Sequence, residues 1–208
     1  DYVYLDYVYF ARLLEADKQY EEAVVQFNKA LSMDKSHTEI YKDISDVYEK
    51  KRDFPKAIEA YKNYLDEMKS SPDISDLFLY GRLNYYAATD SAYQDKQPTY
   101  LAEADTIFAQ VAVKVPDNYL GNFWRARVNS LRDPETTQGL AKPYYEAALS
   151  ILEQKPDATK SVLVECNSYL GYYYFVKEDY NQSKQYWNKI LEIDPENETA
   201  TKALGGIK

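Results

Sequence analysis

The chain has 208 residues and a formal net charge of −9 at pH 7, which argues against a general nucleic-acid binder because phosphate backbones require a basic protein face. It contains no run of about 18 apolar residues that could span a membrane, and its single cysteine excludes an intramolecular disulfide. The 23 tyrosines and only 6 glycines are typical of long amphipathic helices with tight junctions.

Two segments of the N-terminal third share one helical pattern. Residues 20–31 (YEEAVVQFNKAL) and residues 54–65 (FPKAIEAYKNYL) both place an alanine three positions after an aromatic residue, and a second aromatic residue four positions after the alanine. The two alanines, Ala23 and Ala57, are 34 residues apart. A period of this length indicates an array of stacked helical hairpins.

The pattern continues through the rest of the chain at longer spacings. It returns in residues 101–111, 139–149 and 180–191, where the small residues are Ala104, Ala141 and Ser183. A second feature lies upstream of these segments, where a bulky residue precedes a small one, as in Ile44–Ser45 and Leu170–Gly171. Because small residues let two helices approach closely, each unit is predicted to be a pair of packed helices.

These units resemble tetratricopeptide repeats (TPRs), and residues 167–195 (NSYLGYYYFVKEDYNQSKQYWNKILEIDP) carry the fullest signature. The resemblance implies an all-α fold, a right-handed TPR superhelix (α-α solenoid) of about five helix-turn-helix repeats. Residues 1–208 then form a single solenoid, with approximate repeats at 4–37, 38–71, 74–118, 119–155 and 156–197. A short C-terminal helix over 195–204, halted by Gly205-Gly206, is expected to act as the solvating cap of the array.

The longer spacings come from insertions. Residues 88–100 and residues 132–139 are polar and contain proline, so both are predicted to be loops that project from the array. Residues 154–165 are expected to add a turn to the first helix of the last repeat.

The N-terminal segment DYVYLDYVYFARLL is apolar on several sides and has no preceding helix-start signal. The end of a solenoid with this composition needs a cover. We therefore expect the chain to be the C-terminal part of a longer protein with further repeats upstream. A short disordered lead-in is the alternative, and self-association through this end is a further candidate.

Residues suited to catalysis are scarce. His37 is the only histidine and is predicted to lie in a solvated junction, and Cys166 has no histidine near it in sequence, which favours a buried structural thiol. The sequence has no glycine-rich phosphate loop, and acidic pairs such as Glu21–Glu22 fall on exposed helix faces. We therefore predict a protein that is no enzyme, with neither a metal nor a cofactor.

The resemblance implies that the first helix of each repeat lines a concave groove, and helical spacing then selects the side chains that face it. Three motifs, VYFAR (8–12), FLYGR (78–82) and FWRAR (123–127), each end in a small residue followed by arginine. Arginine binds carboxylates through two parallel hydrogen bonds and stacks on aromatic rings. The predicted peptide-binding groove consists of Arg12, Lys42, Phe78, Arg82, Tyr85, Phe123, Arg127 and Tyr172.

Two interpretations of the arginines stay open. They can form a ladder that faces a partner peptide, or they can pair internally with Glu39, Asp46 and Glu165 on the same face. The asparagine set with which some TPR chaperone adaptors hold a C-terminal carboxylate is not present in this sequence, so that activity does not carry over.

Three functions compete at this point. The first is a non-enzymatic protein–protein interaction scaffold whose groove binds a protein or peptide segment. The second is an envelope accessory protein that engages glycan or another envelope subunit through the tyrosine-rich surface, and the third is an architectural spacer. The abundant tyrosine and acidic composition resemble bacterial envelope TPR proteins, which favours the bacterial periplasm or cell envelope as the location.

Overall fold

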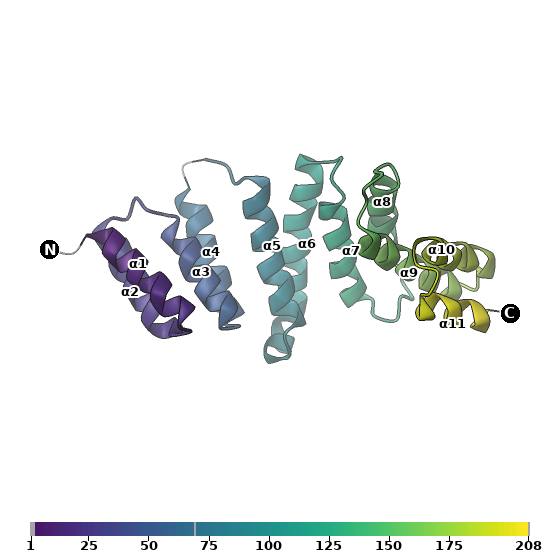
Figure 1. Cartoon of the computed structure of the whole chain (residues 1–208), viewed down its shortest axis with the longest axis horizontal. Coiled ribbons are helices and arrows are strands. Elements are labelled where there is room, and N and C mark those ends of the chain that lie inside the picture. The colour runs from purple at the N-terminus through teal and green to yellow at the C-terminus, as the bar shows by residue number, and fades with distance from the viewer. Residues whose placement is uncertain (1–2, 69, 208) are drawn as a thin grey trace. The chain divides into compact units, whose positions relative to one another are not determined.

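The computed structural model describes residues 3–68 and 70–207, and every regular element in these ranges is helical (Figure 1). The all-α fold class is therefore confirmed. The elements are α1 (Tyr4–Ala16), α2 (Tyr20–Met33), α3 (Ile40–Lys50), α4 (Phe54–Glu67), α5 (Ile74–Thr89), the 3-10 helix η1 (Ser91–Lys96), α6 (Gln97–Lys114), α7 (Leu120–Arg132), α8 (Lys142–Leu152), α9 (Lys160–Val176), α10 (Tyr180–Ile193) and α11 (Glu198–Gly206). Within the described ranges, no helix combines the length and apolarity needed to cross a membrane.

The turns inside repeats 1, 2 and 5 share one backbone geometry. Lys18, Arg52 and Glu178 all have positive φ angles, of 62°, 62° and 60°, a conformation that is uncommon outside glycine. The residue that follows each of them donates its backbone N–H to a carbonyl five positions earlier: Gln19 to Leu14, Asp53 to Tyr48 and Asp179 to Tyr174. The same strained turn at equivalent positions shows that these units are structural repeats.

Small residues let the two helices of a repeat touch. The Ser45 hydroxyl donates to the Ala57 carbonyl at 2.8 Å, and the Ser183 hydroxyl donates to the Gly171 carbonyl at 2.8 Å. A Cβ added at Gly171 would lie 2.7 Å from Cε2 of Trp187, so only glycine fits beneath that indole ring without a shift of the ring. The bulky–small pairs found in the sequence are therefore the contact points of the hairpins.

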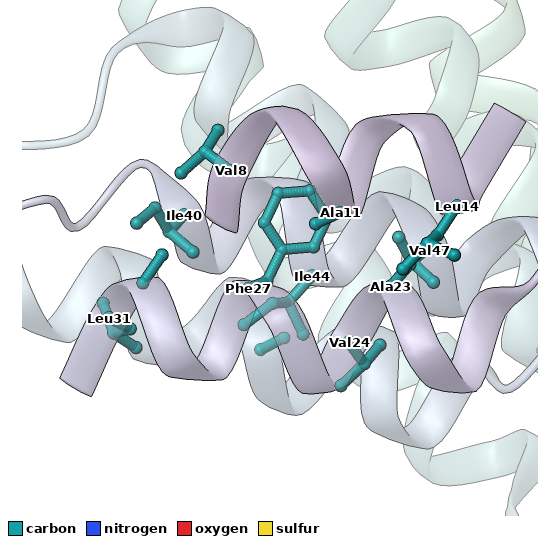
Figure 2. Packing of buried hydrophobic residues seen from close by; sticks show 12 residues of the cluster. Val8, Ala11, Leu14, Ala23, Val24, Phe27, Leu31, Ile40, Ile44 and Val47 are labelled. Carbon is teal, nitrogen blue, oxygen red and sulfur yellow. The ribbon is translucent and has the colours of Figure 1, made fainter. Parts of the chain in front are cut away.

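The apolar faces of α1, α2 and α3 meet in one core (Figure 2). The ring of Phe27 extends from α2 toward Ala11 of α1, and Val47 of α3 belongs to the same cluster; all three are fully buried. Burial of a side chain such as Phe27 stabilises the fold by about 1.5–3 kcal/mol. Packing of this kind makes each hairpin depend on its neighbour.

The chain divides into two compact units, Asp1–Tyr100 and Leu101–Lys208. The first holds α1 to α5 and η1, and the second holds most of α6 and all of α7 to α11. Each unit is described by itself below. The prediction of a single solenoid over residues 1–208 stays a prediction.

The prediction of a projecting loop over residues 88–100 is wrong. This segment contains η1 and the start of α6, and it packs against the second repeat. The hydroxyl of Tyr93 donates to the Arg52 carbonyl at 3.1 Å, its ring meets Phe54 edge to face, and the Arg52 side chain donates to Asp90. A tyrosine within a polar segment thus had a packing role that composition alone did not indicate.

Residues 132–139 also differ from a projecting loop. Asp133 is buried, and its carboxylate accepts backbone N–H bonds from Gln138 at 3.0 Å and Gly139 at 2.7 Å. Gly139 has a φ of +72°, and a Cβ there would lie 2.4 Å from Tyr173 Cε2. The hydrogen bonds to Asp133 and the close contact of Gly139 with Tyr173 hold this segment against the helices of unit 2.

The C-terminal helix is shifted from the predicted range of 195–204. It begins at Glu198 because the side chain of Asn197 accepts from the Ala200 backbone N–H at 3.0 Å, which makes Asn197 the N-cap. The helix continues through Gly206 and does not stop before the glycine pair. Buried Ala200 packs with Trp187 of α10, so α11 covers α10 as a cap.

Candidate partner-binding site

The predicted groove residues lie on the first helices of the repeats. One register position recurs on these helices, directly after the small residue that contacts the second helix. It is occupied by Arg12, Asp46, Arg82, Arg127 and Tyr172 on α1, α3, α5, α7 and α9. We call this set the register residues. Each of the arginines forms an ion pair with a carboxylate on another first helix of its own unit.

Arg12 is the most exposed of the three arginines. Its Nη2 atom lies 3.0 Å from Oδ2 of Asp43 on α3, and about half of the Arg12 side chain remains exposed. Burial raises the pKa of the Asp43 carboxyl, and the hydrogen bond from Arg12 opposes that rise. A half-exposed pair of this kind contributes little to stability.

Lys42 belongs to a mostly buried polar network. Its Nζ atom lies 2.9 Å from Oδ1 of Asp76, a residue that is almost completely buried at the start of α5. The hydroxyls of Tyr61 and Tyr64 donate to the same carboxylate at 3.3 and 3.5 Å, and the Lys42 ammonium lies 4.7 Å from the centre of the Tyr64 ring. Burial alone would lower the pKa of Lys42, but the hydrogen bond and charge of Asp76 outweigh it and raise the pKa. Lys42 therefore joins repeats 2 and 3.

Arg82 is less firmly held. Its Nη2 atom makes one contact with the carboxylate of Glu49 on α3, at 3.3 Å. Its Nε atom is buried and donates to no acceptor among the described residues. The guanidinium lies 5.4 Å from the centre of the Tyr86 ring. Arg82 thus combines an aromatic support with hydrogen-bonding capacity that the described chain uses only in part.

Arg127 is held tightly. Its Nε and Nη2 atoms donate to the two oxygens of Glu165 at 2.7 and 2.6 Å, and the Tyr145 hydroxyl donates to the same carboxylate at 3.2 Å. The guanidinium lies 4.5 Å from the centre of the Phe123 ring. Such a bidentate pair has the strongest geometry available to arginine and carboxylate.

The aromatic residues of the predicted groove fall into two groups. Phe78 and Tyr85 on α5 are half-buried, and Tyr172 on α9 is exposed. The prediction for Phe123 needs a correction, because this ring is only 3% exposed and packs edge to face against Tyr145 in the core of unit 2. Helical spacing placed it beside Arg127 correctly, but the guanidinium covers the ring.

The acids that pair with these cations were mostly not the ones predicted. Glu165 was identified, whereas Asp43, Glu49 and Asp76 were not. Each pair joins residues 31 to 38 positions apart. A search for opposite charges one repeat apart on the first helices would have found them, and that is the signal that the sequence contained.

Cys166 lies on α9, one of the first helices. Cys166 is fully buried, as predicted, and burial raises the pKa of its thiol to about 12, so the reactive thiolate is not populated at neutral pH. No cluster of potential metal ligands occurs in the part of the chain that the structure describes. The first helices present charged and aromatic groups, which are suited to non-covalent contacts.

The helical hairpins of both units are those of an α-solenoid, and comparison with known proteins identifies the family. The tetratricopeptide repeat profile matches residues 7–37 and 169–197. The solved C-terminal part of a TPR repeat-containing protein from Cytophaga hutchinsonii is 30% identical, with a TM-score of 0.83 over 98% of this chain and 74% of that one. The chain therefore belongs to the tetratricopeptide repeat family, which confirms the predicted TPR solenoid.

Other solved structures share the fold at lower identity. YrrB, described as a TPR protein with an unusual peptide-binding site, is 19% identical with a TM-score of 0.62, over 95% of this chain and 89% of that one. MamA from Desulfovibrio magneticus RS-1 is 11% identical with a TM-score of 0.65, over 94% of this chain and 97% of that one. No curated protein sequence matches significantly. The TPR fold supports a role as a protein–protein interaction scaffold.

Proposed function

We propose that this chain is a non-enzymatic scaffold that binds a segment of a partner protein on its first helices, with unit 1 as the principal contact. The observation that carries the proposal is Arg82, which has a single 3.3 Å ion pair and a buried Nε that donates to no described acceptor. YrrB, another TPR protein, is described as having an unusual peptide-binding site.

The surroundings of Arg82 define the chemistry of the partner. Phe78 and Tyr85 lie on the same helix, one turn to either side of the arginine. A guanidinium flanked by aromatic rings suits a carboxylate that is followed by an apolar side chain. Arg12, half-exposed on α1, would provide a second cation. We therefore infer an acidic segment with an aromatic or aliphatic residue near the acid.

Arg127 has a different role in this proposal. Its guanidinium already forms two short hydrogen bonds with Glu165, and a partner carboxylate would have to displace them. We assign Arg127 to the cohesion of repeats 4 and 5.

A peptide array tests the proposal without a known partner. The probe is a set of short acidic peptides with and without an aromatic residue, incubated with wild type, Arg82→Met and the control Lys62→Met. Methionine keeps the apolar length of arginine, and Lys62 is an exposed residue on the second helix α4 whose loss removes the same charge.

We expect wild type and Lys62→Met to retain the acidic aromatic peptides, and Arg82→Met to lose them at an unchanged melting temperature. The loss should be at least about tenfold in affinity, as for a central arginine contact. Equal retention by all three proteins, or by none, would refute a binding site at Arg82.

The architectural spacer is the second candidate, and one observation favours it. The three arginines and Lys42 all form ion pairs within the chain, as a purely structural role would require. This candidate predicts no selective retention on the array and a lower melting temperature for Arg82→Met.

A further inference from the structure

Exposed large apolar side chains gather at two distant positions in the sequence, and the first is α1. Tyr9, Phe10 and Leu13 are all at least half exposed. Together with Asp6 they follow the spacing i, i+3, i+4 and i+7, so these residues form one stripe along the helix. We call Asp6, Tyr9, Phe10 and Leu13 the α1 stripe.

The equivalent helix positions on α3, α5 and α7 are buried. Leu13 lies two positions after the small residue Ala11, and the residues at the same register on α3, α5 and α7 are Val47, Leu83 and Val128. Those three are 0%, 3% and 0% exposed, whereas Leu13 is 65% exposed. The α1 stripe is therefore a packing surface that the described chain leaves uncovered.

The second position is a small apolar pocket in unit 2. It lies between α9 and the last turn of α11, has a volume of about 230 Å³, and is lined by Tyr172, Phe175, Trp187, Lys202, Gly206 and Ile207, among others. Tyr172 and Phe175 are both more than two-fifths exposed at its mouth. We call this the α11 pocket.

We propose that the α1 stripe of one copy of this chain docks into the α11 pocket of a second copy. A helix with anchors at i, i+3, i+4 and i+7 is the form that enters apolar grooves, and Phe10 is the residue placed to fill the pocket. The interaction is independent of the proposed peptide-binding function at Arg82.

The charges at the two surfaces are complementary. Asp6 stands at one end of the stripe, and Lys202 is the charged residue among the described residues that line the pocket. Lys202 pairs with Glu198 at 2.9 Å, but both side chains are more than three-quarters exposed. Such a pair is weak in water, so Lys202 can turn to Asp6 of the docked copy at little cost.

The geometry of this contact determines the kind of assembly. The two surfaces are different patches, so the contact is heterologous, and it either closes into a ring or continues as an open chain. Association should therefore increase with protein concentration. The pocket is small, which places the contact among weak interfaces below about 1,200 Å² of buried surface.

Sedimentation velocity over a range of protein concentrations tests the proposal with two blocked variants. Leu13→Glu puts a charge into the exposed stripe. Gly206→Leu adds a bulky side chain at a residue that lines the pocket, where a Cβ meets nothing within 4 Å. The matched controls are Gly205→Leu, whose Cβ also meets open space but which does not line the pocket, and Val113→Glu, at another exposed apolar residue.

We expect wild type and both controls to associate progressively as concentration rises. Each blocked variant alone should associate at least about tenfold more weakly. An equimolar mixture of Leu13→Glu and Gly206→Leu should form dimers and go no further, because each variant retains the surface that the other lacks. A misfolded variant could not produce this recovery, so the mixture also controls for folding.

Two results would overturn the proposal. Wild type that stays monomeric at every concentration would show that the stripe and the pocket do not bind each other. Gly206→Leu that associates as wild type does would show that α1 pairs with α1 in a closed dimer and that the pocket takes no part.

Discussion

Arg82 in unit 1 and Arg127 in unit 2 follow the same sequence motif and occupy the same register position, but the chain binds them differently. Arg127 donates two hydrogen bonds of 2.7 and 2.6 Å to Glu165. Arg82 has one contact of 3.3 Å with Glu49. Arg127 pairs with the first helix that follows it, whereas Arg82 pairs with the one that precedes it. The position of the neighbouring acid therefore decides how tightly a register arginine is held.

The most buried ion pair of unit 1 involves none of the register residues. It joins Lys42 with Asp76 and is supported by Tyr61. In unit 2 the most buried ionic contact is Arg125 with Asp105, and the register arginine Arg127 adds a bidentate pair with Glu165. Three predictions test this division, from the largest expected effect to the smallest.

Replacement of Asp76 should have the largest effect. Asp76→Ala leaves the Lys42 ammonium and the Tyr61 hydroxyl without their acceptor in a mostly buried site. We expect the free energy of unfolding to fall by about 3 kcal/mol, as for one partner removed from a buried pair. Urea denaturation measures the change. The control Glu198→Ala, in a pair whose side chains are both more than three-quarters exposed, should stay within about 0.5 kcal/mol of wild type. If both variants lose similarly little free energy of unfolding, water must replace the hydrogen bonds that Asp76 accepts from Lys42 and Tyr61.

Charge reversal at the two arginines sharpens the comparison directly. Arg127→Glu faces Glu165 with a like charge and removes two charge-assisted hydrogen bonds, so we expect a loss of about 2 kcal/mol in the free energy of unfolding. Arg82→Glu loses one long contact with Glu49 and should cost less than about 1 kcal/mol. Thermal melts of the two variants side by side give the answer. An equal loss of stability in the two variants would show that Arg82 and Arg127 do not differ in how much they stabilise their units.

The third prediction concerns Asp46, another register residue of unit 1. Shielding from solvent by neighbouring groups raises the pKa of its carboxyl, and the charge of Glu49 raises it further. A carboxyl whose folded pKa lies above the ordinary 3.8 stabilises the fold below that value, and this contribution is lost as pH rises through the folded pKa.

Asp46→Asn should therefore match wild type in acid and become slightly more stable toward neutral pH. Because Asp46 is exposed to solvent, the gain should be no more than about 0.5 kcal/mol. Unfolding midpoints of both proteins between acid and neutral pH measure it. A variant that is less stable than wild type at neutral pH would show that Asp46 has a favourable partner, and Asp46→Glu, which keeps the charge, is the control.

The repeat architecture could be predicted from the sequence because it is local. The positions of aromatic and small residues at helical spacing identified the hairpins, and the contacts at Ser45 and Gly171 confirm those positions. The two insertions were misjudged for a related reason. Asp133 is buried and its carboxylate binds backbone N–H groups of its own segment, whereas Tyr93 contacts the backbone of Arg52 in the preceding repeat. Polar composition does not reveal such contacts.

The sequence by itself determined the period, the paired helices and the register at which the arginines stand, because these follow from i, i+3 and i+4 spacing along one chain. The tertiary structure decided which of those arginines is saturated, that Phe123 is covered, and that Lys42 belongs to a buried network. Each of these depends on which carboxylate a neighbouring helix brings within hydrogen-bond distance. Differences of about 1 Å in that distance separate a bidentate pair from a loose contact, and no spacing along one helix contains that information.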